Sequence, residues 1–105
     1  MDRLRIVIGD DHELVRRGIR SLLEARKDWE LCAEAGTGRE VLEAVDKFRP
    51  DVVILDISLP DKNGIEVAHM VRQQFPGTEI LIHVDPEGQT DRETLLSSEI
   101  TERAT

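Results

Sequence analysis

The chain has 105 residues and a formal net charge of −8, so it is long enough for one domain with one core, and its acidity argues against nucleic acid as a direct partner. It contains no long apolar segment, so we expect no signal peptide and no membrane-spanning helix. The single cysteine, Cys32, allows no intramolecular disulfide, and we therefore expect a cytoplasmic protein.

The first strand is predicted at Leu4 to Gly9, where the apolar residues are almost continuous. A helix is predicted from His12 to Arg26. Its buried face is expected to carry the apolar residues at helical spacing: Leu14, Val15, Ile19, Leu22 and Leu23. The opposite face is expected to be solvated and basic, with Arg16, Arg17 and Arg20.

The segment Trp29 to Ala35 alternates between apolar and polar residues. This period of two predicts a half-exposed strand at a sheet edge. One face of that strand is expected to carry Trp29, Leu31, Ala33 and Ala35. The other face is expected to carry Glu30, Cys32 and Glu34.

The next helix is predicted to start after Thr37, because Thr37 and Glu40 have the spacing of a capping box. It is expected to end at Arg49-Pro50. Its inward face is expected to hold Val41, Leu42, Val45 and Phe48.

A central strand is predicted from Asp51 to Asp56, and the chain then turns through Pro60, Asn63 and Gly64. Asn63 and Glu66 predict the cap of a third helix that Pro76-Gly77 closes. That helix is expected to bury Ile65, Ala68, Val71 and Phe75. A fourth strand is predicted at Glu79 to Val84.

This order, β-α-β-α-β-α-β with short connections, predicts an α/β fold with a flavodoxin-like, doubly wound parallel sheet of strand order 2-1-3-4. Residues 1–88 form the predicted core. Residues 89–105 are expected to form an atypical C-terminal helix or tail, capped by Thr90 and Glu93, with no output domain. The apolar run Ile80 to Ile82 leaves an uncovered strand edge, which predicts a homodimer through that edge or through the C-terminal helix, unless another segment covers it.

Three carboxylates are predicted to meet at one edge of the sheet. Asp10 and Asp11 follow the first strand and Asp56 ends the third, and these strands are neighbours in the predicted order. Like charges this close destabilise the fold unless a cation lies between them. A hard cation such as Mg²⁺ takes oxygen ligands, and the arrangement suits phosphoryl transfer to a carboxylate.

The chain resembles the receiver domains of bacterial two-component response regulators, in the subgroup that usually precedes a LuxR-type helix-turn-helix output domain. The resemblance rests on IVIGDDHELVRRGIRSLLE, EAGTGREVLEAV, PDVVILDISLPDKNGIEV and PGTEILI. It implies that Asp56 is the phosphoacceptor and that Mg²⁺ is bound by Asp11, by Asp10 directly or through water, and by the backbone carbonyl of Ser58. It also implies a sensor histidine kinase as partner, docking near the first helix, and a regulatory domain rather than a classical enzyme.

Two departures from the family leave two readings open. Val84 stands where receivers have a Ser or Thr, and no lysine follows Lys62, although receivers have one after a fifth strand. A fifth strand and a last helix are also not predicted. The chain is therefore either a phosphoacceptor domain or a degenerate receiver that acts as a phosphorylation-independent interaction module. A haloacid-dehalogenase-type phosphatase is disfavoured, because it needs Asp-x-Asp where this chain has adjacent acids.

The three histidines share no metal-ligand spacing. His12 is predicted near the acidic site and His69 on a solvated helix face. His83 is interpreted as an ordinary strand residue rather than a switch.

Overall fold

The computed structural model describes residues 3–83 of the chain. Strands and helices alternate in that part: β1 (Leu4–Gly9), α1 (Glu13–Glu24), β2 (Trp29–Ala35), α2 (Gly38–Phe48), β3 (Val52–Asp56), α3 (Gly64–Gln74) and β4 (Glu79–His83). The seven elements predicted between Leu4 and Val84 are all present, with helix ends within two residues of the predicted positions. None of the three helices between residues 3 and 83 is long and apolar enough to cross a membrane.

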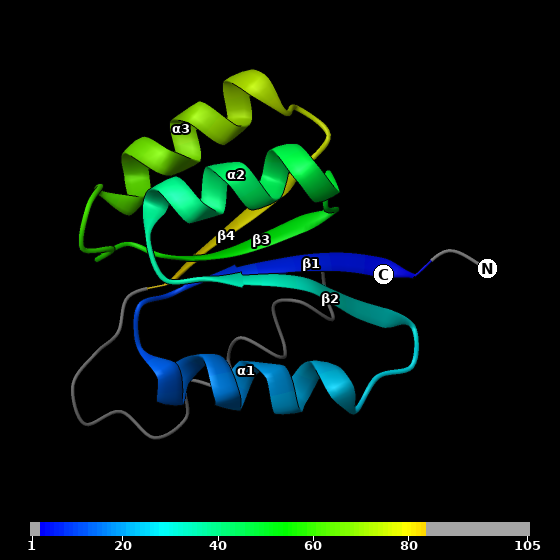
Figure 1. Ribbon diagram of the computed structural model, residues 1–105. Helices are drawn as coiled ribbons and strands as arrows, with labels where there is room; N and C mark the ends of the chain where they lie inside the picture. The colour runs from blue at the N-terminus through cyan, green and yellow to red at the C-terminus, as the bar shows by residue number, and fades with distance from the viewer. Residues whose placement is uncertain (1–2, 84–105) are drawn as a thin grey trace.

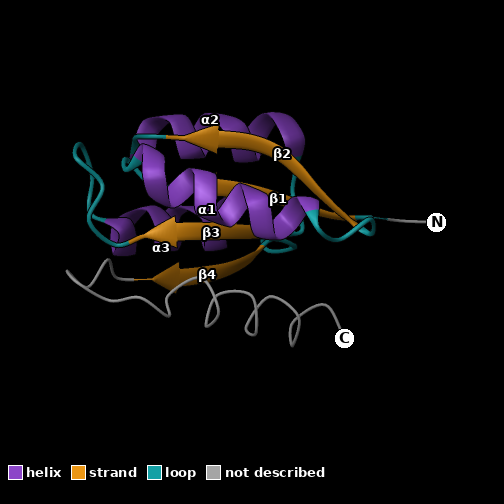
Figure 2. Cartoon of the chain, turned by 90° about the horizontal axis from the view of Figure 1, so that it is seen from below, coloured by secondary structure: helices purple, strands orange, loops and turns teal. Residues whose placement is uncertain are grey.

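The four strands form one parallel sheet in the order β2-β1-β3-β4. Helix α1 covers one face, and α2 and α3 cover the other (Figure 1). Figure 2 shows the strand order from below, with β2 at one edge of the sheet. The predicted flavodoxin-like fold and its strand order are confirmed, because short right-handed crossovers leave few other arrangements of these elements.

The predictions for Val84, for the cap at Thr90 and Glu93, and for a C-terminal helix fall on residues 84–105, outside the described residues. Among residues 3–83, β4 pairs only with β3. Ile82 on β4 is 41% exposed. The predicted homodimer through the β4 edge stays a prediction.

The core has two halves, one on each face of the sheet. Strands β1 and β3 contribute alternate residues to both halves, since successive side chains of a strand point to opposite faces. The half beneath α1 contains Ile6, Ile8, Ile19, Leu23, Trp29, Val52, Ile54 and Leu81. The half beneath α2 and α3 contains Val7, Ala35, Val41, Val45, Val53, Leu55, Leu59, Val67, Ala68 and Val71.

A β-bulge interrupts the alternation predicted for β2. Ile6 pairs with Leu31 and the next residue of β1, Val7, pairs with Ala33, so Cys32 is the extra residue. Such a bulge turns the following side chains to the opposite face. Leu31 packs beneath α1, whereas Cys32 and Ala33 both pack beneath α2 and α3. The prediction that Trp29, Leu31, Ala33 and Ala35 share one face was therefore wrong.

Two side chains predicted to be buried are exposed. Leu14 of α1 is 78% exposed and Ile65 of α3 is 45% exposed. Each lies in the first turn of its helix. In the same turns, however, Val15 packs against the core beneath α1 and Gly64 is buried. Leu14 and Ile65 therefore lie on the solvent side of their helices. The face of α3 that is buried instead is formed by Val67, Ala68 and Val71.

The predicted caps form, with one difference. Thr37 Oγ1 accepts the Glu40 amide of α2 at 3.1 Å, and Asn63 Oδ1 accepts the Ile65 amide of α3 at 2.8 Å. The Glu40 carboxylate, however, accepts the Gly36 amide at 3.0 Å rather than that of Thr37. The reciprocal half of the predicted capping box is thus displaced by one residue.

Candidate functional site

The carboxyl ends of β1 and β3 lie side by side at the centre of the sheet. The two strands pair from Ile6 with Val52 to Gly9 with Leu55. Asp10 and Asp56 each directly follow the last pair of this ladder, and both side chains are fully buried. Two charged groups are therefore held next to each other by strand register.

Glycine is required where α3 begins, directly behind Asp56. A Cβ atom on Gly64 would lie 2.5 Å from the backbone oxygen of Asp56 and 2.6 Å from Cα of Ile57. The contact is with backbone atoms, which cannot rotate away. The backbone of Gly64 is close enough to donate a 2.9 Å hydrogen bond to the Ile57 carbonyl. This packing fixes the position of the loop that carries Ser58.

Four side chains meet in the crevice: Asp10, Asp11, His12 and Asp56. Their possible ligand atoms all lie within 4.8 Å of one another. Asp11 and His12 are accessible, since their side chains are 34% and 51% exposed. The structure thus brings together the three predicted carboxylates, and it adds the histidine expected nearby.

The two oxygens of Asp56 have different surroundings. Oδ1 accepts the Ser58 amide at 3.0 Å. Oδ2 is buried and has no hydrogen-bond partner among the described residues. Burial, together with the negative charges of Asp10 and Asp11, raises the pKa of Asp56 above its ordinary value, against the opposing effect of the Ser58 amide. Ser58 lies on an exposed loop position.

Asp10 is held by two histidines, one at each oxygen. Oδ1 accepts the His12 amide at 2.8 Å, and His83 Nε2 lies 3.3 Å from Oδ2. Although burial alone would raise the pKa of Asp10, its contacts with His83 and His12 hold that pKa below the ordinary value. The pKa values of the two neighbouring carboxyl groups are therefore shifted in opposite directions, and Asp10 loses its proton more readily than Asp56 does.

His83 is the site residue that the sequence interpretation missed. It is only 7% exposed and pairs in register with Asp56 at the end of β4. Its position next to the carboxyl end of the predicted fourth strand was the available signal, because the carboxyl ends of adjacent parallel strands meet. The predictions for His12 and His69 are confirmed: His12 lies in the site, and His69 is exposed on α3.

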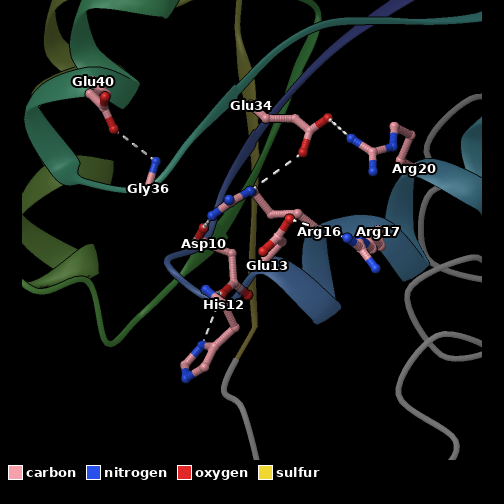
Figure 3. A network of polar contacts seen from close by, with 9 residues as sticks. All are labelled: Asp10, His12, Glu13, Arg16, Arg17, Arg20, Glu34, Gly36 and Glu40. Atoms are coloured by element: carbon pink, nitrogen blue, oxygen red, sulfur yellow. Dashed lines mark hydrogen bonds and ion pairs between the residues drawn. The ribbon is translucent and has the colours of Figure 1, made fainter.

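An arginine network ties α1 to the site (Figure 3). Arg16 Nη1 donates to the backbone oxygen of Asp10 at 2.6 Å, and its Nε lies 3.4 Å from Glu34. Arg20 Nη1 donates to Glu34 Oε2 at 2.6 Å. The prediction of a solvated arginine face holds only for Arg17, which is 61% exposed. Arg16 and Arg20 instead form ion pairs with Glu34, because the bulge in β2 directs Glu34 toward α1.

The loop after β3 also caps a helix that is distant in sequence. Asp61 Oδ1 accepts the Gly38 amide at 2.7 Å and Oδ2 accepts the Arg39 amide at 3.1 Å, at the start of α2. These amide hydrogen bonds lower the pKa of Asp61. The loop that carries Ser58 is thus attached to α2 as well as to α3.

The chain matches the response regulator receiver domain family over residues 6–102. It is 40% identical over 79 residues to the uncharacterized transcriptional regulatory protein YhcZ of Bacillus subtilis. The aligned region covers 75% of this chain and 37% of that protein. It is 41% identical over 80 residues to the oxygen regulatory protein NreC of Staphylococcus epidermidis, again covering 75% of this chain and 37% of that protein. The chain therefore spans a little over a third of the curated relatives that it matches.

Solved structures of receiver domains have the same fold. The receiver domain of the putative response regulator NarL from Mycobacterium tuberculosis is 31% identical, with a TM-score of 0.77 over 92% of this chain and 79% of that one. A LuxR-family response regulator from Aurantimonas sp. is 34% identical, with a TM-score of 0.74 over 93% of this chain and 69% of that one. The chain belongs to the response regulator receiver domain family, in the LuxR/NarL subgroup of two-component regulators.

Proposed function

We propose that this receiver domain accepts a phosphoryl group on Asp56, with a Mg²⁺ ion held by Asp10, Asp11, Asp56 and the backbone carbonyl of Ser58. The observation that supports this most is the Oδ2 atom of Asp56, which is buried beside two other carboxylates without a hydrogen-bond partner among the described residues. A buried, unpaired polar atom is costly, and one retained at a strand end is a sign of a ligand site.

The donor set fits a hard divalent cation. The crevice offers one oxygen each from Asp10, Asp11 and Asp56 within 4.8 Å, and hard cations are held in proteins by carboxylate and carbonyl oxygens together with water. When bound, Mg²⁺ would neutralise the charge that gathers on the carboxylates and on the incoming phosphoryl group. Asp11, being partly exposed, can receive the ion from solvent.

Asp56 acts as the nucleophile. One of its carboxylate oxygens forms a bond to phosphorus while the bond between phosphorus and the donor breaks. The donor is a phosphohistidine of a sensor histidine kinase, whose ring nitrogen takes the electron pair of the broken P–N bond and regains a proton from solvent. The Ser58 amide holds the carboxylate in place through Oδ1. The product is an acyl phosphate on Asp56.

The kinase is expected to dock over the start of α1, beside the crevice. Leu14 offers an apolar contact there, since 78% of it is exposed. Arg17 adds a positive charge on the same helix, and among residues 3–83 its ion pair is with Glu13 at 3.4 Å. Both residues lie outside the core, so a partner can contact them without disturbing the fold.

The experiment is phosphorylation of the full chain with acetyl phosphate, an acyl phosphate that replaces the kinase, followed by intact-mass measurement. We expect a gain of one phosphoryl group with Mg²⁺, reversal by hydroxylamine, and no gain after chelation of the metal. Asp56→Asn should abolish the gain, whereas Asp51→Asn, at the other end of the same strand, should keep it. A gain that persists in Asp56→Asn would contradict the proposal. No gain with any donor would favour the phosphorylation-independent interaction module.

A further inference from the structure

We propose that His12 is a fourth side-chain ligand at this crevice, beside Asp10, Asp11 and Asp56, and that its imidazole gives the site affinity for a borderline divalent metal such as Zn²⁺ or Co²⁺ that the carboxylates alone would not supply. This inference deepens the proposed function and rests on its metal site. It concerns which cation the site selects, rather than whether Asp56 is phosphorylated.

The position of the ring nitrogen supports this assignment. His12 Nδ1 lies 3.0 Å from Asp11 Oδ1, 3.1 Å from Asp10 Oδ1 and 3.9 Å from Asp56 Oδ2. Two ligand atoms bound at about 2.1 Å and at right angles would be about 3.0 Å apart, and two on opposite sides of a metal about 4.2 Å apart. All three separations from the imidazole nitrogen fall within these limits. The four ligand atoms together lie within 4.8 Å of one another, so the carboxylates would have to move closer, by less than about 1 Å, to surround one ion.

His12 stands at the N-cap position of α1 but does not cap that helix with its side chain. The equivalent residues of α2 and α3, Thr37 and Asn63, each accept an amide of their own helix. The backbone of His12 is fixed, since its amide donates to Asp10 at 2.8 Å. Its ring faces the carboxylates instead of the helix amides, as Figure 3 shows for Asp10.

A second histidine holds the Asp10 carboxylate in place from the far side. His83 Nε2 lies 3.3 Å from Asp10 Oδ2, whereas His12 Nδ1 faces Oδ1 of the same carboxylate. Hydrogen-bonding groups behind a metal ligand fix its orientation and strengthen binding. Asp56 Oδ2 completes the set as a buried oxygen without a hydrogen-bond partner in residues 3–83.

The chemistry of the donors determines the class of metal. Mg²⁺ prefers oxygen ligands and keeps its water, whereas imidazole nitrogen suits Zn²⁺, Co²⁺ and Ni²⁺. A site with three carboxylate oxygens and one imidazole nitrogen therefore has affinity for both classes. Removing the imidazole should weaken the second class and leave the first almost unchanged.

The test is a titration of the full chain with Mg²⁺, Co²⁺ and Zn²⁺ separately, in wild type, in His12→Gln and in His69→Gln. The last variant is the matched control, because His69 is exposed on α3. Loss of one ligand should weaken Co²⁺ and Zn²⁺ binding by roughly 10- to 100-fold and Mg²⁺ binding by less than about threefold. The control should match wild type. Thermal melts followed by circular dichroism check that each variant folds.

A second measurement on the wild-type protein needs no substitution. Long-range ¹H–¹⁵N NMR of the imidazoles with added Zn²⁺ should show a shift of Nδ1 of His12 and none for His69. The inference would be overturned if His12→Gln weakened Mg²⁺ binding and Co²⁺ binding equally. It would also be overturned if Zn²⁺ left the Nδ1 resonance of His12 unshifted. A chain that binds Mg²⁺ and gains a phosphoryl group could still fail these tests, so the two proposals can fail separately.

Discussion

The two ends of strand β3 carry the same residue type in opposite circumstances. Asp51, just before the strand, is exposed and fully engaged: its carboxylate accepts the Arg5 amide at 2.9 Å, its amide donates to the Arg5 carbonyl at 2.8 Å, and its carbonyl accepts the Glu79 amide at 2.8 Å. Asp56, at the other end, is fully buried, and its Oδ2 has no hydrogen-bond partner within residues 3–83. The hydrogen bonds of Asp51 therefore stabilise the amino end of the sheet. At the carboxyl end, the unpaired oxygen of Asp56 lowers the stability of the fold, and a bound cation could offset that loss.

The largest expected effect is at Gly64, at the carboxyl end. Gly64→Ala places a Cβ atom 2.5 Å from the Asp56 backbone oxygen, and we expect a loss of about 3 kcal/mol in the free energy of unfolding, because backbone atoms must move. Urea denaturation of wild type and Gly64→Ala measures this difference in the free energy of unfolding. Gly77→Ala is the matched control near the start of β4, where the added Cβ has no atom within 4 Å from the described residues beyond its two chain neighbours. Equal stability of the two variants would show that the carboxyl end is not tightly packed.

The second largest effect is expected at Asp56, where a substitution should stabilise the fold. We expect Asp56→Asn to raise the melting temperature at neutral pH in the absence of divalent metal, because it removes a buried charge that lies beside Asp10 and Asp11. Asp51→Asn should leave the melting temperature nearly unchanged, since the amide oxygen can still accept from Arg5. Excess Mg²⁺ should narrow the difference between wild type and Asp56→Asn. A lower melting temperature for Asp56→Asn would mean that its charge is already balanced.

The gain from Asp56→Asn should depend on pH in a definite direction. The folded pKa of Asp56 lies above the ordinary value of 3.8, so the folded state binds the proton more tightly than the unfolded state does. Stability from this group is present at low pH and is lost as the pH rises through the folded pKa. The gain should therefore be full above the folded pKa of Asp56 and disappear as the pH falls toward 3.8. Melting both variants across this range measures it, and a gain that grows on acidification would contradict the sign.

A smaller effect is expected from the ion pairs of β2. Glu34→Gln should cost about 1 kcal/mol, since Arg20 and Arg16 both reach this partly exposed carboxylate and solvent screens part of the attraction. The matched control is Asp28→Asn at the amino end, whose ion pair within residues 3–83 is an exposed one with Arg26 at 3.3 Å. The loss at Glu34 should shrink in high salt. A double-mutant cycle with Arg20→Gln checks that the pair itself is responsible.

The smallest effect is expected at Asp61. Asp61→Ala removes the acceptor of the Gly38 and Arg39 amides, and we expect faster amide hydrogen exchange in the first turn of α2 with a small change in overall stability. Exchange in the first turn of α3, which Asn63 caps, is the internal control. Faster exchange throughout the sheet would mean that Asp61 supports the whole fold rather than one helix start.

Much of the candidate site followed from local sequence pattern. The apolar runs ending at Asp10 and Asp56 predicted adjacent strands, and the strand order then placed their carboxylates together. The caps at Thr37 and Asn63 were predictable for the same reason, because a cap involves residues only two or three positions apart. Burial was predicted less well: the helical period alone placed Leu14 and Ile65 inside, although both side chains lie on the solvent side of their helices.

By itself, the sequence determined the order of the elements, the parallel sheet and the meeting of three carboxylates, since these depend on short-range periodicity and on the handedness of the crossovers. Only the tertiary structure decided that a bulge at Cys32 directs Glu34 to Arg16 and Arg20, that Asp61 caps a distant helix, and that His83 reaches Asp10. Those contacts join residues far apart in the chain. They depend on strand register and loop packing to within about an ångström, which no local pattern specifies.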